Sequence, residues 1–314
     1  MKQSLFFVAA VILISSSATL LSAQTPANTH SDSALLGLRE PSVITNRSTA
    51  AGVPDEAVDL NNTGVRKAIA GDYEGAVRDL QAALKIAPSF SRASVNLGLA
   101  YGYLHQYALA ITIVKDLTVS SPDFADGHAV LGELQLKSGS IDEAIANLKR
   151  GLSLDAKDHY GLTNLGSCYF EKKMYREAIE AFDEAIKVNA RFVVPYNNKG
   201  TALVKLGKYK EAVSAFSEAI AIDKNTGEAY NNLGVALDHL GKKKEAHQAY
   251  VEAVRLRPTW DYALYNLALS YIEQGNKEEA TRQMNALAAL DSKLADKVKD
   301  QLWARYVVNA SKIN

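Results

Sequence analysis

The chain has 314 residues, of which 47% are apolar, so it is long enough to bury one large core or two ordinary ones. Lysine plus arginine and aspartate plus glutamate balance at 35 each. This neutrality argues against nucleic acid as the main partner, since such binding needs a basic face. The single cysteine, Cys168, excludes an intramolecular disulfide, so stability must come from packing.

Residues 1–23 have the layout of a secretory signal peptide. Lys2 gives a positive start, residues 5–14 form an apolar run, and the exit that ends in Leu21, Ser22 and Ala23, the last two with small side chains, favours cleavage after Ala23. A retained membrane anchor is the alternative, but the apolar run is shorter than the roughly 20 residues that a spanning helix needs. We therefore expect export, to the bacterial periplasm or the extracellular space, with no stable membrane span after signal removal.

Residues 24–54 are rich in Ser, Thr, Ala and Pro and show little apolar periodicity. Such a composition predicts a flexible linker between the signal and the folded part. Residues 34–38 contain three leucines and could form a short docking motif, which no other sequence feature supports.

From residue 57 onward the sequence repeats with a period of 34 residues, without an insertion or deletion. Glycine falls at place eight of the first six units, and alanine falls at place twenty of all seven. The units are residues 57–90, 91–124, 125–158, 159–192, 193–226, 227–260 and 261–294.

Each unit predicts two helices joined by a turn. Large apolar residues mostly recur at places four, seven and eleven, which is helical spacing. Glycine near place fifteen ends the first helix in five units, and proline at place 32 stops the second in three. The small residues at places eight and twenty let the two helices approach closely. Because one hairpin cannot bury its own apolar face, the units are expected to stack.

This pattern resembles the tetratricopeptide repeat family over about three quarters of the chain. The resemblance implies an all-α fold, a right-handed superhelical solenoid of seven tetratricopeptide helical hairpins within residues 55–294. Three positions depart from the family pattern: Ser94 and His128 replace a large residue at place four, and Gly151 replaces the usual alanine.

The end of the chain predicts one more helix. Leu294, Val298, Leu302 and Tyr306 lie four residues apart, which makes one apolar stripe. We expect a C-terminal capping helix and tail over residues 295–314, because the open end of a solenoid needs a polar cover. A partner-binding helix is the alternative interpretation.

Asparagine recurs at place six of every unit except the third, where Val130 stands. At 100° per residue, place six lies far from the apolar stripe, and the family resemblance implies that this side lines the concave surface of the solenoid. A primary amide offers two donors and an acceptor, which suits the backbone of an extended peptide. The predicted peptide-binding groove comprises Asn62, Asn96, Asn164, Asn198, Asn232, Asn266, Asn197, Asn231, Tyr160 and Tyr262. The alternative is that the amides only bond to neighbouring repeats.

The rest of the predicted groove is mostly uncharged. Among the 28 residues at places two, five, nine and twelve, the charged ones are Arg92, Asp126, Glu133, Glu228 and Asp238. We therefore expect the partner to be a protein or peptide that offers a neutral to mildly apolar extended segment. The run of amides from Asn164 to Asn266 is unbroken, so it is the first place where a gripped peptide is expected.

No catalytic, metal or cofactor site is predicted. Cys168 lies beside the helix joint, where a buried core residue is expected, and the six histidines lack ligand spacing. The sequence thus favours a non-catalytic protein–protein interaction scaffold that binds an extended segment in its concave groove, and not an enzyme. The alternatives are a structural spacer or assembly factor in a cell-envelope complex, acting through its convex face and terminal helix, and the recognition arm of an enzyme held elsewhere.

Overall fold

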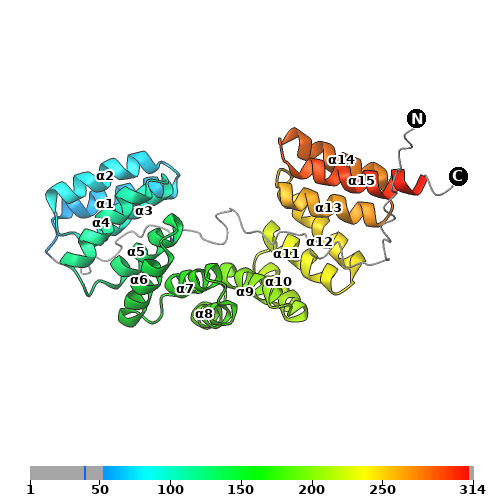
Figure 1. The fold of residues 1–314 in the computed structure, drawn as a ribbon. Helices are drawn as coiled ribbons and strands as arrows, with labels where there is room; N and C mark the ends of the chain where they lie inside the picture. Colours follow the sequence, from blue (N-terminus) through cyan, green and yellow to red (C-terminus); the bar gives the residue numbers. More distant parts are fainter. Residues whose placement is uncertain (1–38, 40–51, 311–314) are drawn as a thin grey trace, which may run out of the picture. The chain divides into compact units, whose positions relative to one another are not determined.

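The computed structural model describes residue 39 and residues 52–310, all within the compact unit Asp32–Asn314. The signal expected over residues 1–23 and most of the linker expected over residues 24–54 lie outside the described residues. The described part forms fifteen consecutive helices and contains no strand (Figure 1). The predicted all-α fold class is therefore confirmed.

Fourteen of these helices pair into seven hairpins, in each of which a first helix packs on the second helix that follows it. The first helices are α1 (Asp55–Ile69), α3 (Ser91–Tyr103), α5 (Ala125–Ser138), α7 (His159–Glu171), α9 (Val193–Lys205), α11 (Gly227–His239) and α13 (Asp261–Glu273). The second helices are α2 (Tyr73–Ile86), α4 (Tyr107–Ser120), α6 (Ile141–Leu154), α8 (Tyr175–Val188), α10 (Tyr209–Ile222), α12 (Lys243–Leu256) and α14 (Lys277–Ala289). From α2 and α3 onward, the helices of each kind begin 34 residues apart, which is the period of the sequence.

A residue in the left-handed backbone conformation ends each first helix. Glycine fills this place in five hairpins, with φ between 73° and 85° in four of them and 86° at Gly139. His105 and Lys173 fill it in the other two, with φ of 58° and 61°. A side chain at such an angle is unfavourable because its Cβ crowds the backbone. The turn is therefore imposed by the stacking of the hairpins even where glycine is missing.

The glycine at place eight makes room for the large side chain at place 24 of the same hairpin. A Cβ built on Gly200 would lie 2.5 Å from Cε1 and 2.8 Å from Cζ of Phe216, whose ring is fully buried. Gly166 meets Phe182 in the same way. In these hairpins the close approach of the two helices thus depends on the absence of a side chain at place eight, in agreement with the expectation of a small residue there.

Neighbouring hairpins bury apolar side chains together and meet mainly where a second helix packs on the first helix of the next repeat. Leu80, Val114 and Leu134, from three successive repeats, belong to one buried cluster. Each second helix from α2 to α12 also packs on the first helix of the next repeat, and first helices of neighbouring repeats touch one another from α1 through α11. We use the term inner face for the surface formed by places two, five, six and nine of the first helices.

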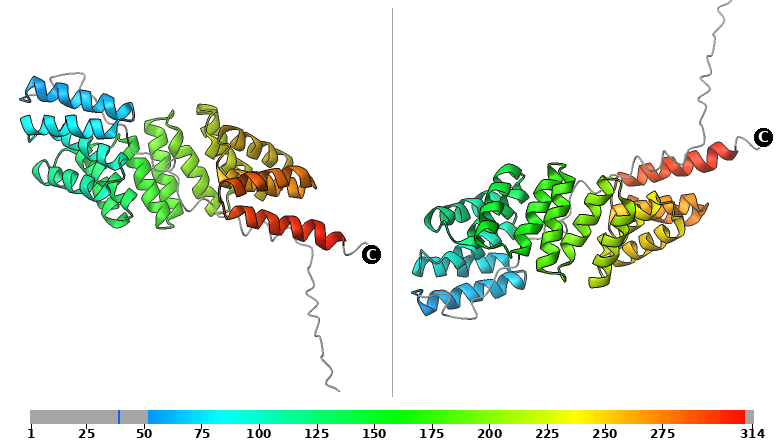
Figure 2. Two further views of the ribbon diagram at one scale, coloured as in Figure 1. Left: turned by 90° about the horizontal axis from the view of Figure 1, so that it is seen from above. Right: turned by 90° about the horizontal axis from the view of Figure 1, so that it is seen from below.

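The last helix, α15 (Leu294–Ala310), covers the end of the array (Figure 2). Its Leu294, Val298 and Leu302 are buried in a cluster with side chains of α13 and α14, among them Leu287. The predicted capping role of the apolar stripe is therefore confirmed. On the opposite side Trp303 is 65% exposed. None of the helices within residues 52–310 is long and apolar enough to cross a membrane.

Candidate functional site

The place-six asparagines bond across the boundary between repeats. The Nδ2 of Asn266 donates to Oδ1 of Asn231 at 2.8 Å, and Asn232 donates to Asn197 at 3.1 Å. In both pairs, the amide at place six reaches the amide at place five of the preceding repeat. The first two repeats form the same link, in which Asn96 donates to Asn61 at 2.9 Å.

Neighbouring amides extend these links into a chain. The Nδ2 of Asn231 lies 3.4 Å from Oδ1 of Asn232, so Asn266, Asn231, Asn232 and Asn197 follow one another across the last three repeats. All of these but Asn232 are buried. This geometry supports the alternative in which the amides tie the repeats together, while their role in peptide binding stays a prediction.

The chain of amides is interrupted in the third and fourth repeats. Asn164 is 4% exposed, and its Nδ2 has no hydrogen-bond partner among the described residues. Place five of the preceding repeat is Ala129, which cannot accept a hydrogen bond from it. Asn198 meets Thr163 at that place and donates instead to Oγ of Ser167, at 3.5 Å. Val130, at place six of the third repeat, has no side-chain amide, so the amide link between repeats is missing on both sides of the third repeat.

The other predicted groove residues lie at the inner face with varying exposure. Asn62, Tyr160 and Tyr262 are half-buried, whereas Asn61 and Asn197 are fully or almost fully buried. The amides with the deepest burial offer little surface to a partner, so the half-buried side chains are the more accessible ones.

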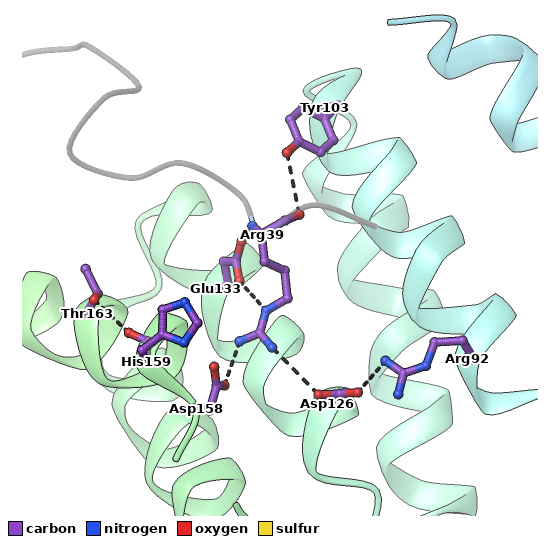
Figure 3. A network of polar contacts seen from close by, with 8 residues as sticks. All are labelled: Arg39, Arg92, Tyr103, Asp126, Glu133, Asp158, His159 and Thr163. Carbon is purple, nitrogen blue, oxygen red and sulfur yellow. Dashed lines mark hydrogen bonds and ion pairs between the residues drawn. The ribbon is translucent and has the colours of Figure 1, made fainter. Parts of the chain in front are cut away.

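A second polar site lies at the inner face of the second to fourth repeats, where the guanidinium of Arg39 meets three carboxylates (Figure 3). Arg39 Nε lies 3.1 Å from Glu133 Oε2, and Nη2 lies 2.7 Å from Asp158 Oδ2. Nη1 lies 3.7 Å from Asp126, which also pairs with Arg92 of α3. We call Arg39 with its three carboxylates the arginine site.

The backbone of Arg39 is held as well. Its N–H donates to Glu133 Oε1 at 2.6 Å, and the hydroxyl of Tyr103 donates to its carbonyl at 3.5 Å, which is long for a hydrogen bond. The guanidinium carbon lies 5.6 Å from the centre of the Tyr160 ring. Both the side chain and the backbone of Arg39 are therefore contacted by side chains of α3, α5, α7 and the turn before α7.

The local sequence explains where the carboxylates come from. Glu133 is at place nine of α5, on the side of the helix that carries the inner face. Asp158 directly precedes α7, yet its carboxylate makes no hydrogen bond to the helix end and turns to Arg39 instead.

Burial strengthens the electrostatics of the arginine site. Glu133 is 1% exposed and the Arg39 side chain 12%. Burial disfavours the charge of Arg39, but Glu133 and Asp158 outweigh that effect and raise the pKa of Arg39 above its ordinary value. Burial also raises the pKa of Glu133, against the opposing charge of Arg39. It lowers the pKa of Lys137 to about 8, so this lysine in the same helix is the weaker cation near Glu133.

The arginine site was not predicted. Arg39 belongs to a segment interpreted as a linker, and it contacts residues 94 and 119 positions away. Asp126 and Glu133 were visible as two of the five charged residues in the mostly uncharged predicted groove, but Glu228 and Asp238 give the sixth repeat the same number of carboxylates. Charge at these places therefore did not single out the third repeat as the site for a cation.

Cys168 and the histidines show no arrangement for chemistry in the described part of the chain. Cys168 is fully buried beside Leu136 and Leu148, and burial raises its pKa to about 12, so it packs as a core side chain as expected. Within residue 39 and residues 52–310, no group of three or more His, Cys, Asp or Glu could hold a metal ion.

These helical hairpins, repeated every 34 residues and stacked with each second helix against the first helix of the next repeat, define a solenoid of the tetratricopeptide type. The chain belongs to the family described as the cilia and flagella-associated protein 70 C-terminal domain, a tetratricopeptide-type family whose sequence model matches residues 124–311, more than half of the chain.

Solved structures share this fold. A tetratricopeptide repeat protein from Parabacteroides merdae has a TM-score of 0.59 at 16% identity, over 80% of this chain and 99% of that one. Pseudomonas aeruginosa pilF has a TM-score of 0.60 at 19% identity, over 67% and 97%. A chain of the APC/C hetero-tetramer Cut9-Hcn1 has a TM-score of 0.64 at 19% identity, over 71% and 44%. A comparison with curated proteins gave no match.

At these identities the solved structures are informative about the fold alone. Tetratricopeptide solenoids are generally non-catalytic scaffolds for protein–protein interaction, since their stacked helices present extended binding surfaces. The fold therefore points to protein partners.

Proposed function

We propose that this chain is a non-catalytic scaffold that holds an extended segment of a protein partner along its inner face. The observation that carries this proposal is the binding of Arg39, whose N–H, carbonyl and guanidinium are contacted by Glu133 of the inner face and by Tyr103 and Asp158 beside it. A surface that holds the backbone of one polypeptide segment is suited to hold another.

The inner face away from the arginine site suits a neutral to mildly apolar segment. Val235 and Leu269, at place nine of α11 and α13, are half-buried apolar side chains, and Asn232 next to them is half-buried too. An amide between apolar neighbours offers hydrogen bonds to a peptide backbone and contact to its side chains. The predicted groove residues in these repeats are therefore retained in the proposal.

Export is part of the same proposal. Residues 1–23 have the layout of a secretory signal, so the scaffold would meet its partner in the bacterial periplasm or outside the cell. Fusion of residues 1–30 to a reporter enzyme that is active only after export tests this, and activity without export of the fusion would contradict it.

The binding face is tested by two matched valine substitutions. Peptides are first selected from a display library on the immobilised chain, and their affinities are then measured by fluorescence anisotropy. Val235→Glu places a carboxylate at a half-buried position, where it keeps contact with solvent. Val251→Glu, on the second helix α12, is the control because this side chain is 36% exposed and lies away from the inner face.

We expect Val235→Glu to weaken the selected peptides at least ten-fold and Val251→Glu to leave them unchanged. Circular dichroism and melting curves of both variants show whether the fold is retained. The opposite pattern, or no selectable peptide, would contradict binding at the inner face.

A second candidate function is assembly into a larger complex through the terminal helix. The observation that favours it is Trp303, a large aromatic side chain that is 65% exposed on α15. Trp303→Ser should then prevent incorporation into that complex without changing peptide affinity, which cross-linking in the producing cells would detect.

A further inference from the structure

The carboxylate of Glu133 has no counterpart in the other repeats. Place nine of the first helix holds an uncharged side chain in each of them. These are Val65, Leu99, Ser167, Thr201, Val235 and Leu269. Stacking of the hairpins therefore does not need a charge here. Because an unpaired carboxylate at 1% exposure is strongly unfavourable, Glu133 requires a cation beside it.

The arrangement around Arg39 suits arginine better than lysine. Glu133 accepts a hydrogen bond from Nε and Asp158 accepts one from Nη2, so two carboxylates bind different edges of one planar guanidinium. An ammonium group has no Nε and cannot satisfy both positions in this geometry. The Tyr160 ring, 5.6 Å from the guanidinium carbon, adds a cation–π contact.

The ligand must also supply a backbone. Glu133 accepts the N–H of Arg39 as well as Nε, and the Tyr103 hydroxyl reaches the carbonyl of the same residue. An arginine within an extended segment offers all of these groups, whereas an arginine in a helix has its N–H engaged internally.

Charge balance shows that the site attracts a cation. Asp126, Glu133 and Asp158 supply three carboxylates, and Arg92, which pairs with Asp126, supplies one permanent positive charge. Arg39 supplies the second positive charge. Burial lowers the pKa of Lys137, near Glu133, to about 8. Without Arg39 the net charge of the site is negative, so the guanidinium of another arginine is attracted to it.

We infer that the arginine site is a recognition site for arginine in an extended segment, that Arg39 fills it in cis, and that a partner segment carrying arginine binds there when Arg39 leaves. This inference rests on the proposed function and specifies both the ligand chemistry and its regulation. Arg39 is then an internal competitor that keeps the site filled until a better ligand arrives.

The length of chain after Arg39 allows this exchange. Fifteen residues separate it from Asp55, the first residue of α1, and they span up to about 50 Å when extended. A tether of this length gives an effective concentration on the order of millimolar at the site. A partner present at micromolar concentration must therefore bind with more contacts than Arg39 alone makes, which gives the site its selectivity.

The test uses a synthetic peptide with the sequence ALLGLREPSVI, which is residues 34–44, labelled with fluorescein. Its affinity is measured by anisotropy against the full chain and against the full chain with Arg39→Gln. We expect the Arg39→Gln chain to bind the peptide at least ten-fold more tightly, because the internal competitor is gone. Peptides with lysine or glutamine in place of the arginine should bind at least ten-fold more weakly.

Substitutions in the site provide the second arm. In the Arg39→Gln chain, Glu133→Gln and, separately, Asp158→Asn are each expected to reduce binding at least ten-fold. Two variants are used so that loss of fold in one, seen by circular dichroism, leaves the other informative. Glu228→Gln is the matched control, since this inner-face carboxylate pairs with Arg257 within the sixth repeat, away from the arginine site.

Equal affinity of the wild-type and Arg39→Gln chains would overturn the internal competition. Equal affinity of the arginine and glutamine peptides, or undiminished binding by both site variants, would overturn the recognition of arginine. Failure here is distinguishable from failure of the proposed function. If the library-selected peptides still depend on Val235, the scaffold function stands without the arginine site.

Discussion

Replacing Asn231 with alanine tests whether the amide chain stabilises the array. Asn231 is 3% exposed and accepts a hydrogen bond from Asn266, 2.8 Å away, so Asn231→Ala leaves the buried amide of Asn266 without its acceptor. An unsatisfied buried donor costs about 1–3 kcal/mol. Alanine in a helix regains about 0.5 kcal/mol of propensity. We therefore expect a net loss of about 0.5–2.5 kcal/mol in the free energy of unfolding.

The assay is urea unfolding followed by circular dichroism, extended to a double-mutant cycle with Asn266→Ala. Because both partners are lost in the double variant, we expect a coupling of about 0.5–1.5 kcal/mol between them. Asn285→Ala is the control, since this asparagine is exposed on α14 and its replacement should be neutral or slightly stabilising. A coupling near zero would refute the conclusion that the amides tie the last two repeats together.

Three further predictions concern the helix joint, the turn and the cysteine. Gly200→Ala should lower the free energy of unfolding by about 1–3 kcal/mol, because the added methyl group meets the buried ring of Phe216; unchanged urea unfolding would contradict this. Lys173→Gly should raise the melting temperature through a gain of up to about 1 kcal/mol, since glycine adopts the left-handed turn without strain, and a lower melting temperature would count against it. Cys168, with a pKa of about 12, should resist iodoacetamide at pH 8 until urea unfolds the chain. Because the unfolded thiol ionises near pH 8.5, Cys168 should also make stability fall as the pH rises from about 8.5 towards 12, more steeply than in Cys168→Ala. Rapid labelling of the folded chain would show that the thiol is accessible.

Most of the fold could be predicted because its information is local and repeated. A small residue at place eight, glycine in six units and Ala268 in the seventh, and an alanine at place twenty restrict the packing of every hairpin, so seven copies of the pattern reinforce one another. The turns at His105 and Lys173 were less visible, because neither residue favours the left-handed conformation that its neighbours impose.

The candidate site was harder to predict because its contacts are not local. Rotation about the helix axis indicated that Asn232 and Asn266 face away from the apolar stripe, but not that place six meets an amide of the preceding repeat. Arg39 lies in a stretch without periodicity, and its partners Glu133 and Asp158 are distant in sequence. The carboxylates Asp126 and Glu133 did not mark the region by themselves, because the sixth repeat carries Glu228 and Asp238 at places of the same set.

The interruption of the amide chain has a consequence for how the array divides. In a one-dimensional stack, stability is approximately the sum of the repeats and the interfaces between them. The interface between the third and fourth repeats lacks an amide link, since Asn164 faces Ala129, yet Arg39 bonds to Glu133 and Asp158 of the third repeat and its guanidinium carbon lies 5.6 Å from the ring centre of Tyr160 in the fourth. Arg39 therefore contacts side chains of both repeats at an interface that the amide chain does not bridge, so that its departure would weaken the coupling between the third and fourth repeats.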